Sequence, residues 1–182
     1  MAHPSTLYRF RLQISDMDRG CYDALDFRVA MHPSESPHFL LTRVLAFALN
    51  WQDGLEFTPG GLSDPDEPAI RVPDPNGSPK LWIEIGNPSA RKLHKAAKAS
   101  PKVMVYTYKD ADLLLKEMAS ADVYHAERIG IFALAPAFLN QLATWLGRDN
   151  SWSVMHDDGS LMVSQGEQSA SIEIQRFGGT TV

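Results

Sequence analysis

The segment Lys80-Leu-Trp-Ile-Glu-Ile-Gly86 decides how the rest of the chain is interpreted. Between its ends every residue is apolar except Glu84, and such a run is typical of a central strand that is covered on both faces. Ser89 follows as the natural N-cap of a helix predicted over Ala90–Ala99. The next apolar run, Val103–Tyr108, predicts a second buried strand. We therefore expect two parallel strands joined by a crossover helix.

The regions on either side of this unit carry alternating or helical patterns of apolar residues. Alternation predicts half-buried strands, whereas apolar residues spaced by three or four predict helices that pack on a sheet. Strands are predicted at Thr6–Ile14, Tyr22–Ala30, Ala69–Val72, Glu127–Leu134, Trp152–Met155, Leu161–Ser164 and Ser171–Arg176, and helices at Phe39–Trp51, Asp110–Ala119 and Pro136–Leu146. The last three strands either extend the central sheet or form a small second one.

The length of 182 residues is suited to one domain, which we expect to span residues 1–182. Its predicted class is α/β, with a mixed central sheet, flanking helices, an N-terminal hairpin and C-terminal β-strands. Cys21 is the only cysteine, which excludes an internal disulfide and a thiolate zinc cluster. No apolar run approaches the roughly 20 residues of a membrane span, so we expect a cytoplasmic protein with no membrane partner.

The net charge of −5 disfavours tight binding to duplex nucleic acid by bulk electrostatics. It is compatible with a carboxylate metal site, because such a site is itself negative. Glu84 is the first candidate ligand, since an ionised carboxylate in an apolar strand must be paired, protonated or bound to a metal. The alternative is that Glu84 lies at the solvent-facing end of its strand, beside Gly86.

An acidic, proline-rich stretch, Asp64-Pro-Asp-Glu-Pro68, precedes this strand. It is either a surface loop or a segment that brings Asp66 or Glu67 into the strand beside Glu84, where two carboxylates would suit Mg²⁺. The basic helix Arg91–Lys98 follows the strand. Its lysines either form a solvated face or place one ammonium group near a metal-bound phosphate.

Taken in order, these features resemble the YaeQ family. The resemblance rests on His-Pro-Ser-Glu at 32–35, Asp-Glu-Pro at 66–68, Leu-Trp-Ile-Glu-Ile-Gly at 81–86 and the basic helix, and it runs over nearly the full chain. Members of that family are mostly uncharacterised bacterial proteins, and their fold resembles PD-(D/E)XK endonucleases. The resemblance therefore implies an endonuclease-like fold for this chain.

Carried onto this sequence, the nuclease pattern places a first-helix glutamate at Glu35, the motif aspartate at Asp66 and the strand acid at Glu84. Arg43, on the first helix, either forms a structural ion pair with one of these acids, which we expect, or holds a phosphate. Gly86 stands where the nuclease motif has its lysine, two residues after the strand acid.

The missing lysine suggests that a lysine of the following helix takes its place, with Lys95 as the first choice and Lys92 as the second. Our first hypothesis is a metal-dependent phosphodiesterase in which Asp66 and Glu84 hold Mg²⁺ or Mn²⁺. In this hypothesis Glu35 binds the ion directly or through water, and Lys95 assists the attacking water. The second hypothesis is a non-catalytic protein that shares the fold and binds nucleic acid or another protein.

Overall fold

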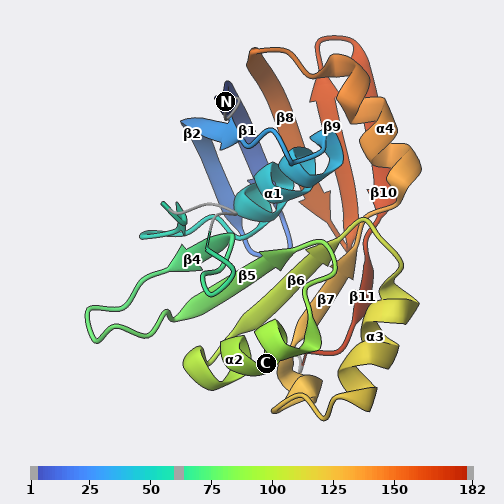
Figure 1. Ribbon diagram of the computed structural model, residues 1–182. Helices are drawn as coiled ribbons and strands as arrows, with labels where there is room; N and C mark the ends of the chain where they lie inside the picture. Colours follow the sequence, from blue (N-terminus) through green and yellow to red (C-terminus); the bar gives the residue numbers. More distant parts are fainter. Residues whose placement is uncertain (1–3, 60–63, 180–182) are drawn as a thin grey trace. The chain divides into compact units, whose positions relative to one another are not determined.

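The run that contains Glu84 forms strand β5 (Leu81–Ile85), whose five residues are all buried. It lies in a six-stranded sheet of order β11-β7-β6-β5-β4-β3 (Figure 1). The other strands of this sheet are β3 (Glu56–Phe57), β4 (Ile70–Val72), β6 (Val103–Thr107), β7 (Gly130–Ala133) and β11 (Gln175–Phe177). The sheet is mixed, because β5, β6 and β7 run parallel while β3, β4 and β11 pair antiparallel with their neighbours.

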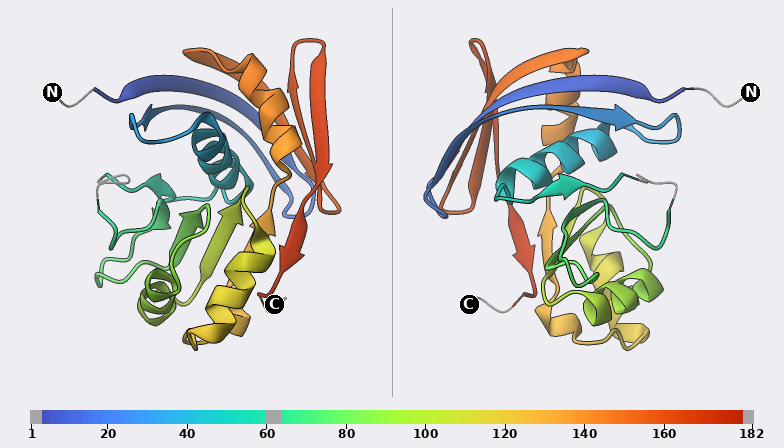
Figure 2. Two further views of the ribbon diagram at one scale, coloured as in Figure 1. Left: turned by 45° about the vertical axis from the view of Figure 1, so that its right-hand side comes forward. Right: turned by 90° about the vertical axis from the view of Figure 1, so that its left-hand side faces the viewer.

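Two helices cover one face of this sheet: α2 (Ala90–Ala99) and α3 (Ala111–Ser120) (Figure 2). The side chain of Ser89 accepts a hydrogen bond from the backbone N–H of Lys92, so the predicted helix and its cap are both confirmed. The buried cluster beneath the helices draws on β5, α2, β6, α3 and β7, and includes Trp82, Leu93, Val105, Leu114 and Ile131. Side chains two residues apart on a strand share a face. Glu84 therefore points to the same side of the sheet as Trp82.

The third parallel strand begins later than the sequence predicts. His125 takes a left-handed backbone conformation, and a 3₁₀ turn, η2 (Ala126–Arg128), follows it. The predicted start of the strand at Glu127 is therefore wrong, and β7 begins at Gly130. None of the residues of this turn is buried, and the buried run resumes at Ile129, directly before β7.

The second sheet has the strand order β10-β9-β8-β1-β2. Its strands are β1 (Thr6–Asp16), β2 (Cys21–Met31), β8 (Asp149–Asp157), β9 (Ser160–Gln165) and β10 (Gln168–Glu173). The predicted N-terminal hairpin is confirmed as β1 and β2, and β1 also pairs in parallel with β8. Strands β8, β9 and β10 thus join the hairpin in a five-stranded sheet. This is the predicted separate second sheet, and it is larger than expected because it also contains the hairpin.

Helices α1 (Pro37–Leu49) and α4 (Pro136–Trp145) pack with this second sheet. Aromatic rings contribute to the contacts between the helices and the sheet. The ring of Phe27 lies against Phe47 of α1, and Trp152 of β8 lies against Trp145 of α4. Ser36 caps α1 by accepting from the N–H of Phe39.

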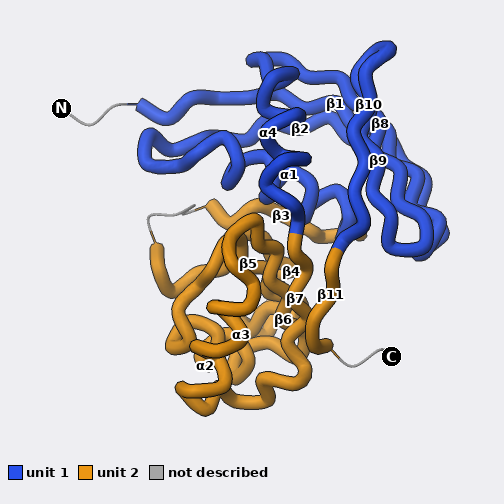
Figure 3. The backbone as a smooth tube through the Cα atoms, turned by 90° about the vertical axis from the view of Figure 1, so that its right-hand side faces the viewer, with its two compact units in different colours: residues 1–51, 134–174 blue, residues 52–133, 175–182 orange. Residues whose placement is uncertain are grey.

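The computed structural model describes residues 4–59 and 64–179. Two compact units make up the chain, each from two segments: unit 1 from residues 1–51 and 134–174, and unit 2 from residues 52–133 and 175–182 (Figure 3). The predicted single C-terminal strand over Ser171–Arg176 is split at this boundary, with β10 in unit 1 and β11 in unit 2. A single domain over residues 1–182 stays a prediction. None of the helices in the described part of the chain is long and apolar enough to span a membrane.

Candidate functional site

Glu84 is a buried acid with two protein donors. Its residue is only 3% exposed, which decides against the alternative of a glutamate at the solvent-facing end of the strand. The indole N–H of Trp82 donates to Oε1 at 2.6 Å, and the Nζ of Lys92 lies 3.0 Å from Oε2. These contacts partly compensate the cost of placing a carboxylate in a low-dielectric interior.

Asp66 forms a second ion pair beside the same helix. The Nζ of Lys95 lies 2.9 Å from Oδ1 of Asp66, and both side chains are largely exposed. Lys92 and Lys95 are one helical turn apart on α2, and side chains at that spacing are neighbours on a helix surface. The helix therefore holds two acids of the predicted site, one buried and one exposed, through two adjacent lysines.

The surroundings of the two carboxylates shift their pKa values in opposite directions. Burial raises the pKa of Glu84 above its ordinary value, although Lys92 and the indole N–H of Trp82 act against that shift. The hydrogen bond and charge of Lys95 lower the pKa of Asp66. Two carboxylates with diverging pKa values are a frequent feature of sites that use acid–base chemistry.

For Asp66 the structure selects the first of the two predicted alternatives, the surface loop. The stretch Asp64–Glu67 forms a turn that precedes β4, so neither Asp66 nor Glu67 enters the strand beside β5. The side chain of Asp64 fixes this turn by accepting the backbone N–H of Asp66. Glu67 is engaged separately, at 2.9 Å from Arg71. Proline at positions 65 and 68 favours a turn over a strand here.

Glu35 belongs to unit 1, whereas the other three predicted site residues belong to unit 2. It precedes the N-cap Ser36 and so lies just outside α1, not on the first helix as the nuclease pattern implies. Its Oε2 lies 3.2 Å from a guanidinium nitrogen of Arg43, and both side chains are buried. Burial raises the pKa of Glu35 and lowers that of Arg43. The expected structural ion pair of Arg43 is therefore present.

Gly86 shows why the motif lysine is absent from this strand end. Its φ angle is +82°, a conformation that L side chains rarely adopt. A Cβ at this position would lie 4.0 Å from Cε of Lys109, which follows the neighbouring parallel strand β6. The side chain of Lys109 thus lies next to the position that a side chain on residue 86 would occupy. Lys109 was not among the predicted site residues. The pattern that could have indicated it is a lysine just after the next parallel strand.

Within residues 4–59 and 64–179, no three His, Cys, Asp or Glu side chains gather in a way that could hold a metal ion. A site on Asp66 and Glu84 would therefore use two carboxylates and complete its coordination with water, as Mg²⁺ sites commonly do. The donor chemistry of the pair fits such an ion. Lys92 and Lys95 occupy one oxygen of each carboxylate in this structure.

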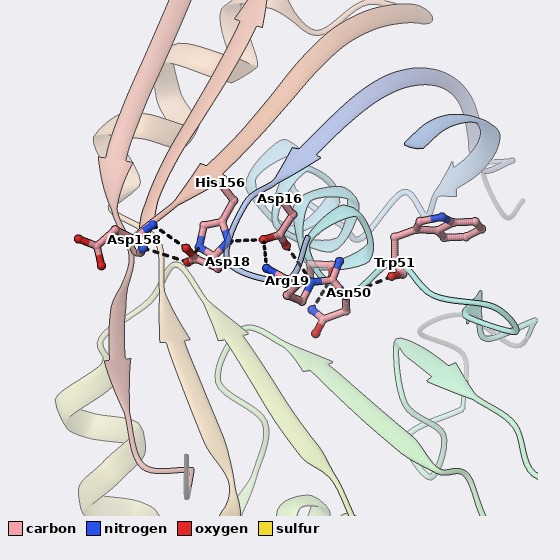
Figure 4. Close-up of polar contacts among 9 residues, drawn as sticks. Asp16, Asp18, Arg19, Asn50, Trp51, His156 and Asp158 are labelled. Carbon is pink, nitrogen blue, oxygen red and sulfur yellow. Dashed lines mark hydrogen bonds and ion pairs between the residues drawn. The ribbon is translucent and has the colours of Figure 1, made fainter. Parts of the chain in front are cut away.

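A second polar cluster lies in unit 1 and was not predicted (Figure 4). Asp16, at the end of β1, is 1% exposed and accepts from Nε of Arg19 at 2.8 Å. Nδ1 of His156, on β8, lies 3.1 Å from Oδ1 of Asp16. Arg19 also donates to the backbone carbonyl of Trp51. No local pattern indicates this cluster, because Asp16 and His156 are 140 positions apart.

Asp18 extends the cluster to the turn between β8 and β9. Its oxygens accept the backbone N–H groups of Asp158 at 2.7 Å and Gly159 at 3.2 Å, and these bonds lower its pKa. Nε2 of His156 lies 3.5 Å from the same carboxylate. The cluster thus ties two hairpin turns of one sheet together, which is a structural role.

Fold and site together define an α/β protein whose described residues form two mixed sheets and four α-helices, with a buried glutamate paired to a partly exposed lysine on the central strand–helix unit. The YaeQ family model ("YaeQ protein") matches residues 1–174, and the chain belongs to that family. It is 27% identical to the uncharacterised protein YaeQ of Salmonella typhi and 26% identical to that of Escherichia coli (strain K12). Each of these alignments spans 176 residues and 96% of both chains.

Two solved structures share the whole fold. The crystal structure of YaeQ protein from Xanthomonas axonopodis pv. citri matches with a TM-score of 0.89 and 32% identity, covering 97% of this chain and all of that one. The crystal structure of YaeQ protein from Pseudomonas syringae matches with a TM-score of 0.89 and 30% identity, covering 98% and 99% of the two chains. The family resemblance found in the sequence is thereby confirmed.

Proposed function

We propose that unit 2 hydrolyses phosphodiester bonds with the help of a divalent cation, and that the chain shares the PD-(D/E)XK nuclease fold. The observation that carries this proposal is the buried carboxylate of Glu84, held 3.0 Å from Lys92 beside the Asp66–Lys95 pair. A strand acid, an upstream aspartate and a nearby lysine are the parts that such a nuclease requires. The proposal uses residues of unit 2 alone, and a role for Glu35 stays a prediction of the sequence.

Each of these residues would have a separate task. Asp66 and Glu84 would hold Mg²⁺ or Mn²⁺, which on binding would supply the positive charge that polarises a phosphoryl oxygen. Trp82 would orient Glu84, because its indole N–H fixes Oε1 and leaves Oε2 for another partner. Lys92, once displaced from Oε2, would hold a phosphate oxygen.

The structure favours Lys92 over Lys95 for this last task. Lys92 contacts the buried acid and its side chain is 22% exposed, whereas that of Lys95 is 49% exposed and pairs with an acid in a turn. Lys109, beside Gly86, is the third candidate. Lys95, the first choice from the sequence, therefore becomes the comparison residue in the experiment.

Calorimetric titration with Mn²⁺ tests the cation site. Wild-type protein should bind the ion, and Asp66→Asn and Glu84→Gln should each remove binding. The control is Asp112→Asn, which neutralises an exposed acid on α3 and should bind like wild type. Unchanged binding in either site variant, or no binding by wild type at millimolar Mn²⁺, would refute the proposal.

Cleavage assays on labelled single- and double-stranded DNA and RNA test the activity. Lys92→Gln should lower the rate by about a hundredfold or more, as expected for a lost transition-state contact. Lys95→Gln should have a much smaller effect. Equal effects of the two substitutions would remove the argument for Lys92.

A second candidate is a non-catalytic protein that binds nucleic acid or another protein. The observation in its favour is that both oxygens of Glu84 already accept protein donors, while Gly86 replaces the motif lysine. In that case Glu84 would serve only to join β5 to α2. Absence of Mn²⁺ binding with a stable fold would support this second reading.

A further inference from the structure

A separate pocket lies in unit 2 at the C-terminal end of α2. Its cavity volume is about 240 Å³, and its walls come from the end of α2, the start of β6 and the segment around η2. Small apolar residues such as Ala97 and Val103 line part of it, while Lys98, Tyr124 and Arg128 contribute polar groups. Lys98 lies six residues after Lys92, or about 9 Å along the helix axis, so the pocket is distinct from the Glu84 site.

The pocket carries positive charge in an acidic protein. Lys98 and Arg128 line it, and its lining includes no Asp or Glu, although the net charge of the chain is −5. Among the described residues, no carboxylate forms an ion pair with Lys98. Arg128 is 3.8 Å from Glu127 and stays 63% exposed. Both cations are therefore able to contact an anion in the pocket.

An aromatic ring stands beside these cations. Tyr124 is 43% exposed, and Nζ of Lys98 lies 5.9 Å from the centre of its ring. The backbone N–H of Tyr124 donates to Nδ1 of His94, on α2, which fixes the segment to the helix. His94 and His125 pack against this ring in T-shaped contacts, with ring centres 6.3 Å and 4.2 Å away, and the exposed part of the ring offers a flat surface on which a base can stack.

Backbone strain marks the same segment. Asp122 and His125, which flank the tyrosine, have φ angles of +51° and +45°. Non-glycine residues in this region cost free energy and persist where the surroundings hold them, often at ligand sites. His125 also lines the pocket, and its Nδ1 lies 3.0 Å from Glu127.

We infer that this pocket binds a nucleotide unit, with its phosphate on Lys98 and Arg128 and its base on Tyr124. The guanidinium of Arg128 suits two phosphate oxygens at once, and the ammonium of Lys98 adds a point charge. The ligand is either a free mononucleotide or one unit of a single-stranded nucleic acid, since both present the same phosphate and base. This inference is independent of the proposed cation site.

Amide chemical-shift mapping with adenosine monophosphate, in buffer that contains a metal chelator, is the first experiment. The shifts should fall on residues 97–100 and 124–129. Adenosine and inorganic phosphate should each bind more weakly, because each lacks one half of the contacts. Shifts centred on Lys92, or no saturable shifts, would overturn the inference. The chelator separates this result from the proposed function, which needs a divalent ion.

Variants assign the contacts. Arg128→Gln and Lys98→Gln should each weaken adenosine monophosphate binding by about tenfold, the loss expected for one charge-assisted hydrogen bond. Tyr124→Leu should weaken adenosine monophosphate but not inorganic phosphate, whereas Tyr124→Phe should bind like wild type. Lys116→Gln, on the exposed face of α3, is the matched control for charge. Equal weakening by Lys116→Gln would show a general charge effect and would overturn the inference that this pocket binds the nucleotide.

A single strand of about eight deoxynucleotides identifies the source of the phosphate. Tighter binding of the strand than of the mononucleotide, lost in Arg128→Gln, would assign the pocket to nucleic acid. Binding of the mononucleotide alone would assign it to free nucleotides. Either result supports the inference, while strand binding that survives Arg128→Gln and Tyr124→Leu would contradict it.

Discussion

Replacement of Lys92 by methionine should destabilise the protein at neutral pH, whereas the same change at Lys95 should not. The side chain of Glu84 is 4% exposed, so without Lys92 it would keep only the indole N–H of Trp82 as a compensating donor. Breaking a buried ion pair by removing one partner costs about 3–5 kcal/mol, and the partial exposure of Lys92 reduces this to about 2–4 kcal/mol. Asp66, the partner of Lys95, remains in water, where an unpaired charge costs little.

The cost of Lys92→Met should also depend on pH. Burial raises the pKa of Glu84 in the folded state above the ordinary value of 4.5, and removal of the lysine charge raises it further. A raised carboxyl pKa means that the folded state binds more protons than the unfolded state above that ordinary value. Stability is therefore lost as the pH rises from 4.5 through the folded pKa. The variant should approach wild-type stability in acid and depart from it towards neutral pH.

Urea unfolding followed by circular dichroism, at about pH 5 and about pH 8, measures both effects. Glu84→Gln serves as the second single mutant of a double-mutant cycle with Lys92→Met. In the Glu84→Gln background, Lys92→Met should cost little, because no buried charge is left to compensate. The reasoning would be refuted by equal destabilisation from Lys92→Met and Lys95→Met at pH 8. A cost of Lys92→Met that does not fall in acid would refute it as well.

Three further predictions follow from local geometry. Gly86→Lys should destabilise the protein by about 1–2 kcal/mol in urea unfolding, because a side chain would be forced to a positive φ, and it should not raise any cleavage rate. Asp18→Asn should remove a stabilising effect that is present in wild type above the ordinary Asp pKa of 3.8 and is lost as the pH falls. The cause is that the N–H groups of Asp158 and Gly159 favour the ionised carboxylate, which lowers its pKa. Thermal melts at a series of acid pH values measure this effect. Ser36→Ala should cost about 1 kcal/mol through loss of the α1 cap, again measured by urea unfolding.

Local patterns predicted most elements because each is encoded within a few residues. Helix α2 is an example, since Ser89 caps it and its apolar residues face β5 and β6. The turn at Asp157–Gly159 is another, with positive φ angles at both of its last two residues. In these cases the determinants of structure lie inside the element itself.

Pairing between distant segments could not be predicted in this way. The parallel pairing of β1 with β8 joins residues about 140 positions apart, such as Leu12 and Trp152. An alternating strand fits any neighbour that buries its apolar face, so periodicity does not identify the partner. For the same reason the run Ser171–Arg176 reads as one strand, although its two halves pair with β9 and β7.

The candidate site shows the same limit at the level of side chains. The sequence singled out Glu84 as a carboxylate within an apolar run, but it left open whether the side chain is buried or lies at the solvent-facing end of the strand. It ranked Lys95 before Lys92, since both lie within reach in sequence and only the orientation of α2 separates them. The sequence left open whether Asp66 lies in a surface loop or in a strand, and the structure places it in a turn, from which it contacts Lys95.

The position of Gly86 connects these observations. A left-handed glycine directly after β5 turns the chain towards α2, and at its positive φ angle a lysine side chain would strain the backbone. In the nuclease motif the lysine lies on the same strand as the acid. Here the candidate lysines lie instead on α2, which follows β5, and at Lys109, after the neighbouring strand β6. Because Lys92 is the lysine that contacts the buried acid, the helix is the stronger of these two sources. The proposed phosphodiesterase would therefore take its lysine from α2, and its test lies in the Glu84–Lys92 contact and not in the strand motif.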